Sequence, residues 1–415
     1  MLYQRWQNTM EARRGKIALR DLTSSRSWTF AELFAAGDAH PVDSTPVVCP
    51  RGNSPEFIIS LLAAWREEKV VCPLEEEQSR PAFPALPENC AHLKWTSGTT
   101  GAPQLISFTE DRLAADAGQI VPVMGLRPDW PNLGVISLAH SYGFSNLVVP
   151  LLLHGIPLIL APSPLPETIR RIAAEEPSLT LAAVPALWRI WHDAGGIPAQ
   201  IRLAISAGAP LPLPLERAVF AASSLKIHNF YGASECGGIA YDTTSEPRTD
   251  ASFVGKPMPA TQVTINDDGC LKVTGPAVGQ TYLPTPSPAL AAGEFQSSDL
   301  AELKDGGLYL RGRGSDLINV AGRKVSPETI ERALLLHAQV RECLVFSTPC
   351  HDSGRTDLIV AMVAASADES ELKNFLLDKL PSWQVPRRWR FVDALPTTSR
   401  GKISRAECRA KFGLD

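Results

Sequence analysis

Short apolar runs alternate with helix-length amphipathic segments through most of this chain, and that alternation restricts its fold more than any other feature. The first clear unit begins with the apolar run Pro46 to Cys49, which reads as a strand. Ser54 and Pro55 then provide an N-cap and a first helical residue, and a second apolar run follows at Val70 to Leu74. Strand, helix and strand in this order predict α/β layers with at least partly parallel strands.

The same kind of unit recurs further along the chain. Its strands are expected at residues 133–138, 156–160, 179–184, 203–206 and 226–229, separated by turns that contain Gly or Pro. The most apolar stretch, Leu147 to Ala161, is interrupted by Pro150, Gly155 and Pro157, so it is too short for a membrane span. We interpret that stretch as buried strands of a folded core.

The pattern changes twice in the second half of the chain. From about Ser252 the strands become short and alternating, with tight turns such as Asp267-Asp268-Gly269, which predicts a small antiparallel β part. Beyond Asp316, a helix starting at Ser326-Pro327, strands at 343–348 and 358–364 and a helix at 372–380 predict a small α+β domain. The expected organisation is an α/β N-terminal domain at 1–315 and a C-terminal domain at 316–415.

Charge and cysteine content exclude several classes of protein. The net charge of −4, without a long block of like charges, argues against a nucleic-acid-binding or membrane-surface protein. The eight cysteines lack the spacing of a zinc site, which favours a reduced, cytoplasmic compartment. The segment Met1 to Arg14 lacks the apolar core of a signal peptide, so export is not expected.

A loop rich in hydroxyl and glycine residues is the first candidate for chemistry. Thr96-Ser97-Gly98-Thr99-Thr100-Gly101 follows a short apolar run. Glycines let backbone N–H groups turn toward an anion, and hydroxyl groups add further donors, so this loop suits phosphate oxygens. It is not a Walker loop, and on composition alone an ordinary polar turn is an equal alternative.

Further motifs make the chain resemble a known group of enzymes over nearly its whole length. The motifs are Asn229-Phe230-Tyr231-Gly232-Ala233-Ser234-Glu235, Gln296-Ser297-Ser298-Asp299-Leu300, Gly312-Arg313-Gly314-Ser315-Asp316 and Pro396-Thr397-Thr398-Ser399-Arg400-Gly401-Lys402-Ile403. Together with the Thr-Ser-Gly loop, they are similar in kind and order to those of the acyl-adenylate-forming superfamily. That superfamily contains acyl-CoA synthetases, aryl-acid ligases, luciferases and peptide-synthetase adenylation domains.

The resemblance implies a reaction, a fold and a set of cofactors. The superfamily joins a carboxylate to the α-phosphate of ATP with Mg²⁺, releases pyrophosphate, and usually passes the acyl group to a thiol. Its fold has a large layered α/β domain and a small mobile C-terminal domain. No carrier segment follows Lys402 before Asp415, so CoA or a separate phosphopantetheinyl carrier protein is the expected acceptor.

The resemblance also assigns roles to residues. It implies that Lys402 is catalytic, because an ammonium group can bridge carboxylate and phosphate oxygens. Glu235, with Thr100, would hold Mg²⁺, and Asp316 would be the hinge on which the small domain turns. Nucleotide contacts are implied for Thr96, Ser97, Gly98, Thr99, Thr100, Gly101, Asn229, Phe230, Tyr231, Gly232, Ser234, Asp299 and Arg313, with adenine stacking for Tyr231 and ribose contacts for Asp299. The alternatives are a solvated tail lysine, a buried tyrosine and a surface Arg–Asp pair.

The acyl pocket is the least specific part of this interpretation. Its expected lining residues are His140, Tyr142, Phe144, Ala207, Gly208, Ala209, Gly232, Cys236 and Gly237. His140 is either a catalytic gate or a hydrogen-bonded core histidine. Residues 133–161 contain no Asp or Glu to pair with a substrate ammonium group, which favours an uncharged aryl or short to medium acyl acid over an amino acid.

Several positions depart from the superfamily pattern. Gln104 stands where the phosphate loop commonly has a lysine, Asn319 where a lysine is common after the hinge, and Arg400 next to Gly401. The segment between residues 75 and 93 is also short for the superfamily. These departures leave open the alternative of an adenylate-binding protein of the same fold that has lost turnover.

Overall fold

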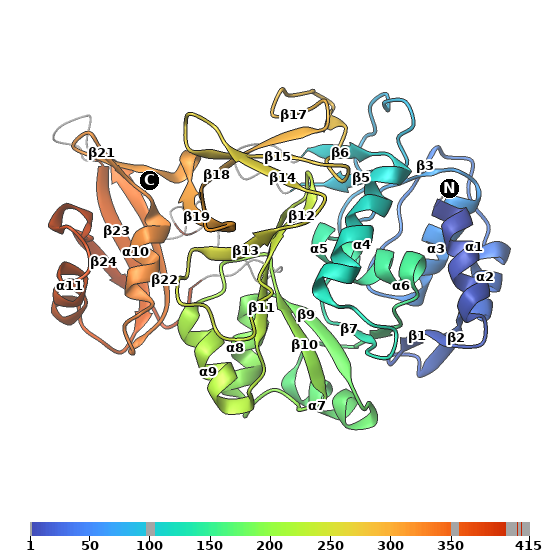
Figure 1. Ribbon diagram of the computed structural model, residues 1–415, viewed down its shortest axis with the longest axis horizontal. Coiled ribbons are helices and arrows are strands. Elements are labelled where there is room, and N and C mark those ends of the chain that lie inside the picture. The colour runs from blue at the N-terminus through green and yellow to red at the C-terminus, as the bar shows by residue number, and fades with distance from the viewer. Residues whose placement is uncertain (1, 97–103, 350–356, 396–404, 406–407, 409–415) are drawn as a thin grey trace.

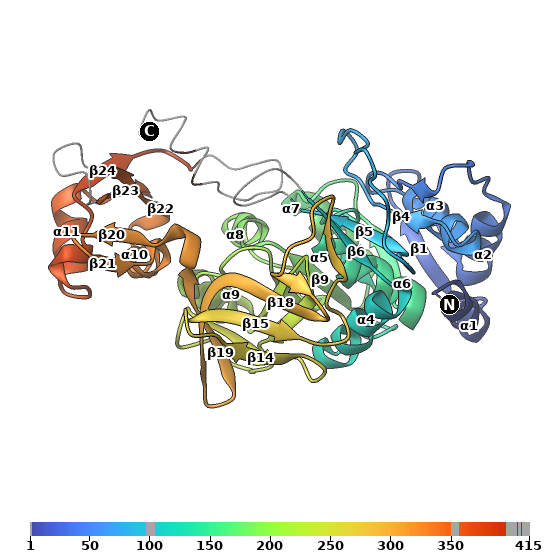
Figure 2. The ribbon, with the colours of Figure 1, turned by 90° about the horizontal axis from the view of Figure 1, so that it is seen from above.

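The structure is a computed structural model that describes residues 2–96, 104–349, 357–395, 405 and 408. It has the mixed α/β architecture expected from the alternation of strands and helices, with a large N-terminal part and a small C-terminal part. In Figures 1 and 2 the small part, formed by β20 to β24, lies at the opposite end of the molecule from α1, α2 and α3. Within the described ranges, no helix is long and apolar enough to cross a membrane.

One large sheet of 14 strands runs through the N-terminal part, and six neighbouring strands of it are parallel. The parallel strands, in spatial order, are β11 (Ile227–Ala233), β10 (Ile201–Ser206), β9 (Leu179–Ala183), β7 (Asn132–Gly134), β8 (Leu158–Leu160) and β1 (Ile17–Asp21). Every residue of β9 is buried, as expected for a parallel strand covered on both faces. Helices α7 (Pro166–Glu175), α8 (Pro185–Asp193) and α9 (Leu213–Ser223) lie beside β9 and β10 in Figure 1, and each has Pro in its first turn.

The rest of the large sheet is antiparallel, which confirms the change of pattern expected near Ser252. Its strands are β12 (Gly237–Tyr241), β13 (Phe253–Pro257), β14 (Gln262–Ile265), β15 (Cys270–Thr274), β17 (Leu290–Ala291), β18 (Glu294–Lys304) and β19 (Gly307–Arg313), with β2 (Arg26–Thr29) at the other edge. Strands β11 and β12 form a hairpin, and β18 and β19 form another. These hairpins carry most of the described candidate site residues.

A second, five-stranded sheet lies beside the first. It has the order β16 (Thr281–Leu283), β6 (Leu105–Phe108), β5 (His92–Trp95), β4 (Val70–Val71) and β3 (Val47–Val48), and it is parallel only from β3 to β5. Helices in this region are α1 (Leu2–Arg13), α2 (Phe30–Ala39), α3 (Pro55–Arg66), α4 (Glu110–Met124), α5 (Ser141–Gly143), the π-helix η1 (Phe144–Val148) and α6 (Val149–His154). Ser54 is the N-cap of α3 and Pro55 its first residue, as the sequence predicts.

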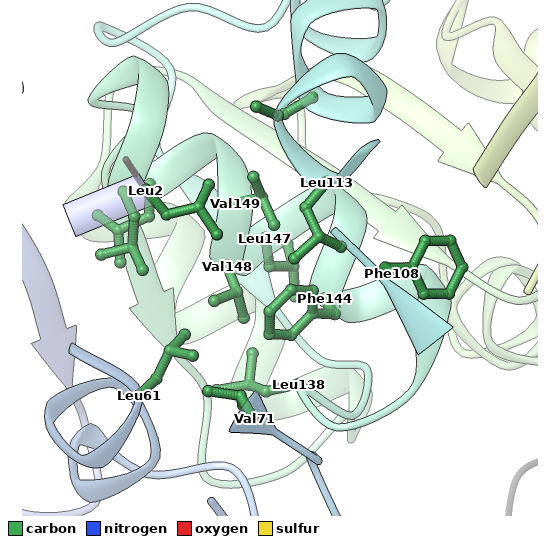
Figure 3. Packing of buried hydrophobic residues seen from close by; sticks show 14 of the residues in the cluster. Leu2, Leu61, Val71, Phe108, Leu113, Leu138, Phe144, Leu147, Val148 and Val149 are labelled. Carbon is green, nitrogen blue, oxygen red and sulfur yellow. The ribbon is translucent and has the colours of Figure 1, made fainter. Parts of the chain in front are cut away.

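The main hydrophobic core joins these helices to the second sheet. Figure 3 shows Phe144 and Leu147 of η1 packed among side chains from other elements, including Leu113 of α4. This region corrects one expectation, because residues 147–154 are helical and only Leu158–Leu160 form a strand. The prediction of strands was wrong because apolar periodicity alone does not separate a buried helix from a buried strand.

The C-terminal part has a core and a sheet of its own. After the 3-10 turn η2 (Gly314–Asp316) come β20 (Ile318–Val320), β21 (Arg323–Val325), α10 (Pro327–Leu334), β22 (Val340–Pro349), β23 (Asp357–Ala365), α11 (Glu369–Leu377), the 3-10 turn η3 (Ser382–Gln384) and β24 (Arg388–Phe391). Buried residues from Ile318 to Val385 form a separate cluster. The domain boundary at residues 315 and 316 stays a prediction.

A buried network of charges anchors the β11–β12 hairpin. Lys226, directly before β11, binds Glu216 of α9 and donates to Asp242, directly after β12, over 2.7 Å. Arg248 Nε donates to the other oxygen of Glu216 over 2.8 Å. Both carboxylate side chains have no exposed area. Because an unpaired buried charge is costly, the four side chains hold both ends of the hairpin on α9.

Candidate active site

Tyr231, Asp299 and Arg313 come together from three strands. Tyr231 of β11 donates its hydroxyl to Asp299 Oδ2 over 2.5 Å, and Arg313 Nε donates to Asp299 Oδ1 over 3.0 Å. Asp299 of β18 lies directly opposite Arg313 of β19 in the antiparallel register. Burial and the neighbouring Asp299 carboxylate raise the pKa of Tyr231 well above its ordinary value, so its hydroxyl remains a donor.

Glu235 lies in the turn between β11 and β12, where the chain reverses beside the second sheet. Its Oε1 accepts a hydrogen bond from the hydroxyl of Tyr282 over 3.0 Å. Tyr282 belongs to β16 and is paired with Ile106 of β6, so both sheets contribute to this contact. Burial raises the pKa of Glu235 above that of an exposed glutamate, although hydrogen bonds, one of them from Tyr282, act in the opposite direction.

The hydroxyl-rich loop connects β5 to β6, and the structure describes its base. Thr96 N donates to Gln104 O over 2.9 Å, and Gln104 N donates to Thr96 Oγ1 over 3.3 Å. The two residues therefore extend the antiparallel pairing of the hairpin up to the loop. The predicted site residues Ser97, Gly98, Thr99, Thr100, Gly101 and Lys402 lie outside the described residues.

The remaining predicted nucleotide contacts all lie on the β11–β12 hairpin. Asn229 is buried, Ser234 is partly exposed in the turn and Gly232 is exposed. Phe230 is only 6% exposed and packs against Tyr142 and Tyr241 in a hydrophobic cluster. The structure thus gives Phe230 a packing role, and its contact with a nucleotide stays a prediction.

The predicted acyl-pocket residues fall into two neighbouring groups. In the first, Tyr142 donates its hydroxyl to Ile205 O over 3.3 Å and shares a cluster with Ala207 and Phe230. Gly208 and Ala209 follow Ala207 after the end of β10 and are exposed. The aromatic side chains of Tyr142 and Phe230, from α5 and β11, thus lie together with the small side chain of Ala207, directly after β10.

The second group contains Phe144 and Cys236, both buried in the main core. Phe144 lies 4.4 Å, between ring centroids, from the buried side chain of His92 in β5. Burial, followed by the nearby Glu235 and Asp116 carboxylates, raises the pKa of the Cys236 thiol well above its ordinary value. Cys236 is therefore a protonated, buried thiol and not a nucleophile.

His140 has a local structural contact in addition to any role in catalysis. It is the N-cap residue of α5, and its Nδ1 accepts a hydrogen bond from Tyr142 N over 3.4 Å. This contact fits the alternative of a hydrogen-bonded histidine at the edge of the core, and the catalytic role stays a prediction.

Sequence reasoning missed two charged residues behind the site. Asp116 of α4 is 4% exposed and accepts hydrogen bonds from Gly238 N over 2.9 Å and from Ser145 Oγ over 2.6 Å. Gly237 has a φ of +68°, and a Cβ there would lie 2.2 Å from Asp116 Oδ1, so glycine is required for this approach. Lys94 of β5 is 5% exposed, and its Nζ lies 4.5 Å from the centre of the Phe108 ring.

A sequence signal existed for each residue. Lys94 lies between the apolar residues Leu93 and Trp95, and Asp116 lies at helical spacing from the apolar residues Leu113 and Ile120. Burial lowers the pKa of Lys94, while the carboxylates of Asp116 and Glu235 act in the opposite direction. Buried Lys94 and buried Asp116 therefore lie close enough to Cys236 to interact with it electrostatically.

The chain is similar to two known protein-family regions and to several solved structures. Residues 66–289 match the AMP-binding enzyme family, and residues 329–402 match the AMP-binding enzyme C-terminal domain. The structure is similar to ATP-bound MatB from Rhodopseudomonas palustris, with a TM-score of 0.86 at 21% identity, covering 99% of this chain and 98% of that one. It is also similar to the o-succinylbenzoate CoA synthetase MenE from Bacillus subtilis in complex with an acyl-adenylate, with a TM-score of 0.83 at 20% identity and 97% coverage of both chains.

Related sequences include ligases for several different acids. The chain is 28% identical to 2,3-dihydroxybenzoate-AMP ligase from Bacillus subtilis, over 84% of this chain and 69% of that protein. It is also 28% identical to anthranilate–CoA ligase from Pseudomonas aeruginosa, over 78% of this chain and 67% of that protein. With both matching family regions in the expected order, the chain belongs to the AMP-binding enzyme family of acyl-AMP-forming ligases.

Proposed function

We propose that the protein activates a carboxylic acid with ATP, forming an acyl-adenylate and pyrophosphate, and then transfers the acyl group to a thiol. The acid is an aryl or a short to medium acyl acid and not an amino acid. The acceptor is CoA or the phosphopantetheine group of a separate carrier protein. Relatives that ligate acids to CoA, and one that forms an AMP conjugate, support this class of reaction.

The contact of Tyr231 and Arg313 with Asp299 is the observation that carries this proposal. Each oxygen of Asp299 accepts one hydrogen bond, which leaves further acceptor capacity on both. A carboxylate held in this way suits two neighbouring hydroxyl groups, such as those of a ribose. The positive charge of Arg313 beside it suits a nucleotide phosphate.

The residues present also fit a magnesium ion carried on the nucleotide phosphates. Mg²⁺ is usually held by one or two carboxylates together with substrate phosphates, and Glu235 supplies one such carboxylate, oriented by Tyr282. Among the described residues, no group of three or more His, Cys, Asp or Glu side chains could hold a metal ion by itself. A bound Mg²⁺ would neutralise phosphate charge, and Thr100 stays a predicted second ligand.

The environment of the predicted acyl pocket supports an uncharged acid body. Tyr142, Ala207 and Phe230 present aromatic and small apolar surface. The buried carboxylate of Asp116 lies close behind the predicted pocket. Both of its oxygens already accept hydrogen bonds from Gly238 and Ser145. Asp116 is thus engaged within the protein, so it does not act as the counter-ion of a substrate ammonium group.

Two further elements of the proposal concern the C-terminal part. Lys402 stabilises the charge that builds up when carboxylate and α-phosphate meet. Asp316 is the hinge about which the C-terminal part turns before thiol attack, because a few backbone torsions absorb such a motion.

Pyrophosphate release from ATP, measured across a panel of aryl and acyl acids with and without CoA, tests the proposal. We expect release to depend on one class of acid, and acyl-CoA to form if CoA is the acceptor. Lys402→Ala should lower the rate of adenylation by about 10²–10³-fold, with a much smaller change in ATP binding. Binding of ATP or a synthetic acyl-adenylate without release of pyrophosphate for any acid would favour the alternative, an adenylate-binding protein without turnover.

A further inference from the structure

Arg405 joins residues from three separate elements. Its Nη1 donates to Asp316 Oδ2 over 3.2 Å, and its Nη2 donates to both oxygens of Glu331 over 2.9 and 3.0 Å. Nη2 also lies 3.0 Å from Glu328 Oε1, and Nε donates to Val345 O over 3.1 Å. Every nitrogen of the guanidinium group therefore has a partner, from η2, α10 or β22.

This cluster lies where the C-terminal part meets the strand that carries Arg313. Asp316 ends the turn η2, which directly follows β19. Gly312, next to Arg313 in β19, has a φ of +122°, and a Cβ there would lie 2.0 Å from Ser326 Oγ and 2.7 Å from Glu328 Oε2. The start of α10 thus packs directly on the end of β19, and Arg405 ties Asp316 to the same helix.

The arrangement of three carboxylates around one side chain favours a guanidinium group over an ammonium group at this position. Three carboxylates surround Arg405, and all four side chains are at most 28% exposed. Burial, and then repulsion by Glu328, raises the pKa of Glu331 to about 7, while Arg405 opposes the shift. A planar guanidinium can donate to several carboxylates at fixed angles, whereas a lysine ammonium is a single point charge on a flexible chain.

We infer that Arg405 is a positioning residue for Lys402, because Arg405 itself is held on the proposed hinge residue Asp316 and on α10. The inference rests on the proposed function, in which Lys402 acts on the reacting groups. Lys402 and Arg405 are separated only by Ile403 and Ser404. Even a fully extended chain spans roughly 10–11 Å over three residues, so anchoring Arg405 limits where Lys402 can reach.

Two substitutions separate this role from a general contribution to folding. Arg405→Lys keeps the positive charge but loses the simultaneous contacts, and Asp316→Asn removes only the charge at the hinge. Each should lower kcat for adenylation by about 10–100-fold, with the KM for ATP changed by less than about threefold, because misplacement by about 1 Å can cost about 10²-fold. The matched control is Arg341→Lys, since Arg341 is exposed on β22 and donates to Asp393 O. It should leave both constants unchanged.

A double-mutant cycle decides whether Arg405 acts through Lys402. If it does, Arg405→Lys should cost less than about threefold in kcat once Lys402 is replaced by Ala, because the two effects then share one cause. Full additivity of the two losses, or an equal loss in adenylation and in thioester formation, would show that Arg405 is only structural and would overturn the inference. Unchanged kinetics in Arg405→Lys would overturn it as well.

A second measurement does not depend on activity. Hydrogen exchange of the backbone amides of residues 314–334 should become faster in Arg405→Lys and in Asp316→Asn than in the wild type and in Arg341→Lys. Unchanged exchange would show that Arg405 does not fix the hinge region. If the wild type forms no adenylate with any acid, the proposed function is wrong. Faster hydrogen exchange in the two variants would then still show that Arg405 holds Asp316, but without the proposed role in catalysis.

Discussion

At the scale of single residues, the candidate site combines motif residues with partners that only the structure shows. Asp299 and Arg313 are separated by a hairpin in the sequence and face each other in the register. Tyr282, which donates to Glu235, lies outside every motif and reaches Glu235 only because β16 pairs with β6. Contacts between distant strands depend on tertiary register, which local patterns do not specify.

The base of the phosphate loop gives a prediction for Gln104. Its backbone closes the hairpin with Thr96, so a side chain at this position starts next to the loop. Gln104→Lys should lower the KM for ATP by roughly tenfold, because a hydrogen bond to a charged group contributes about 1.5–3 kcal/mol. Gln262→Lys, in the exposed first position of β14, is the control for added charge. An unchanged or raised KM would show that another cation already serves the outer phosphates.

Glu331 gives a prediction about pH. Its pKa is raised to about 7 in the folded protein, from 4.5 in an exposed glutamate, mainly by burial beside Glu328 and despite Arg405. The folded state therefore binds this proton more tightly, and the associated stability is present below about pH 4.5 and is lost as the pH rises through 7.

The variant Glu331→Gln lacks this titration. Between pH 5 and 8 the wild type should lose about 1–3 kcal/mol of unfolding free energy relative to Glu331→Gln, measured by urea denaturation. Other titrating groups are common to both proteins and cancel in the difference. Parallel pH profiles would show that Glu331 titrates at an ordinary pKa.

At the scale of secondary structure elements, the sequence predicts elements with strong patterns and misses those that depend on context. The unit from β3 through α3 to β4 was predicted because its N-cap, proline and apolar spacing agree. Helix α11 was predicted at 372–380 and lies at Glu369–Leu377, because its start is set by the cap residue Asp368 and not by the first apolar residue. Strand β24, Arg388–Phe391, alternates arginine with an aromatic residue, but its side chains are largely exposed and four residues are too few for this alternation to predict a strand.

The β11–β12 hairpin depends on the buried charges at its two ends. Glu216 binds both Lys226 and Arg248, so Glu216→Gln leaves two buried cations with only Asp242 as a charged partner in the network. We expect a loss of about 3–5 kcal/mol in unfolding free energy, the cost of removing one partner of a buried ion pair. Glu167→Gln, in an exposed pair with Arg170, should cost less than about 1 kcal/mol. Equal small losses would show that the network is not needed to hold the hairpin.

At the scale of the whole molecule, the predicted class of fold is confirmed, and the chain carries both regions of the AMP-binding enzyme family. The β11–β12 and β18–β19 hairpins and the base of the β5–β6 loop bring residues from both sheets together. Arg405 joins Asp316, in the turn after β19, to α10 of the C-terminal part. The identity of the acid could not be predicted from the sequence, because the residues predicted to line the pocket come from separate elements, among them α5 and β11, and charged residues of α4 and β5 lie behind them.

Formation of an acyl-adenylate is tested by the exchange of labelled pyrophosphate into ATP, measured with each acid of the panel in the absence of any thiol. This exchange requires reversible formation of an acyl-adenylate and does not depend on the acceptor. We predict exchange that appears only with a suitable acid and Mg²⁺, and that falls by about 10²-fold or more in Lys402→Ala. Exchange without an acid, or no exchange with any acid although ATP binds, would show that the protein does not form an acyl-adenylate from an acid.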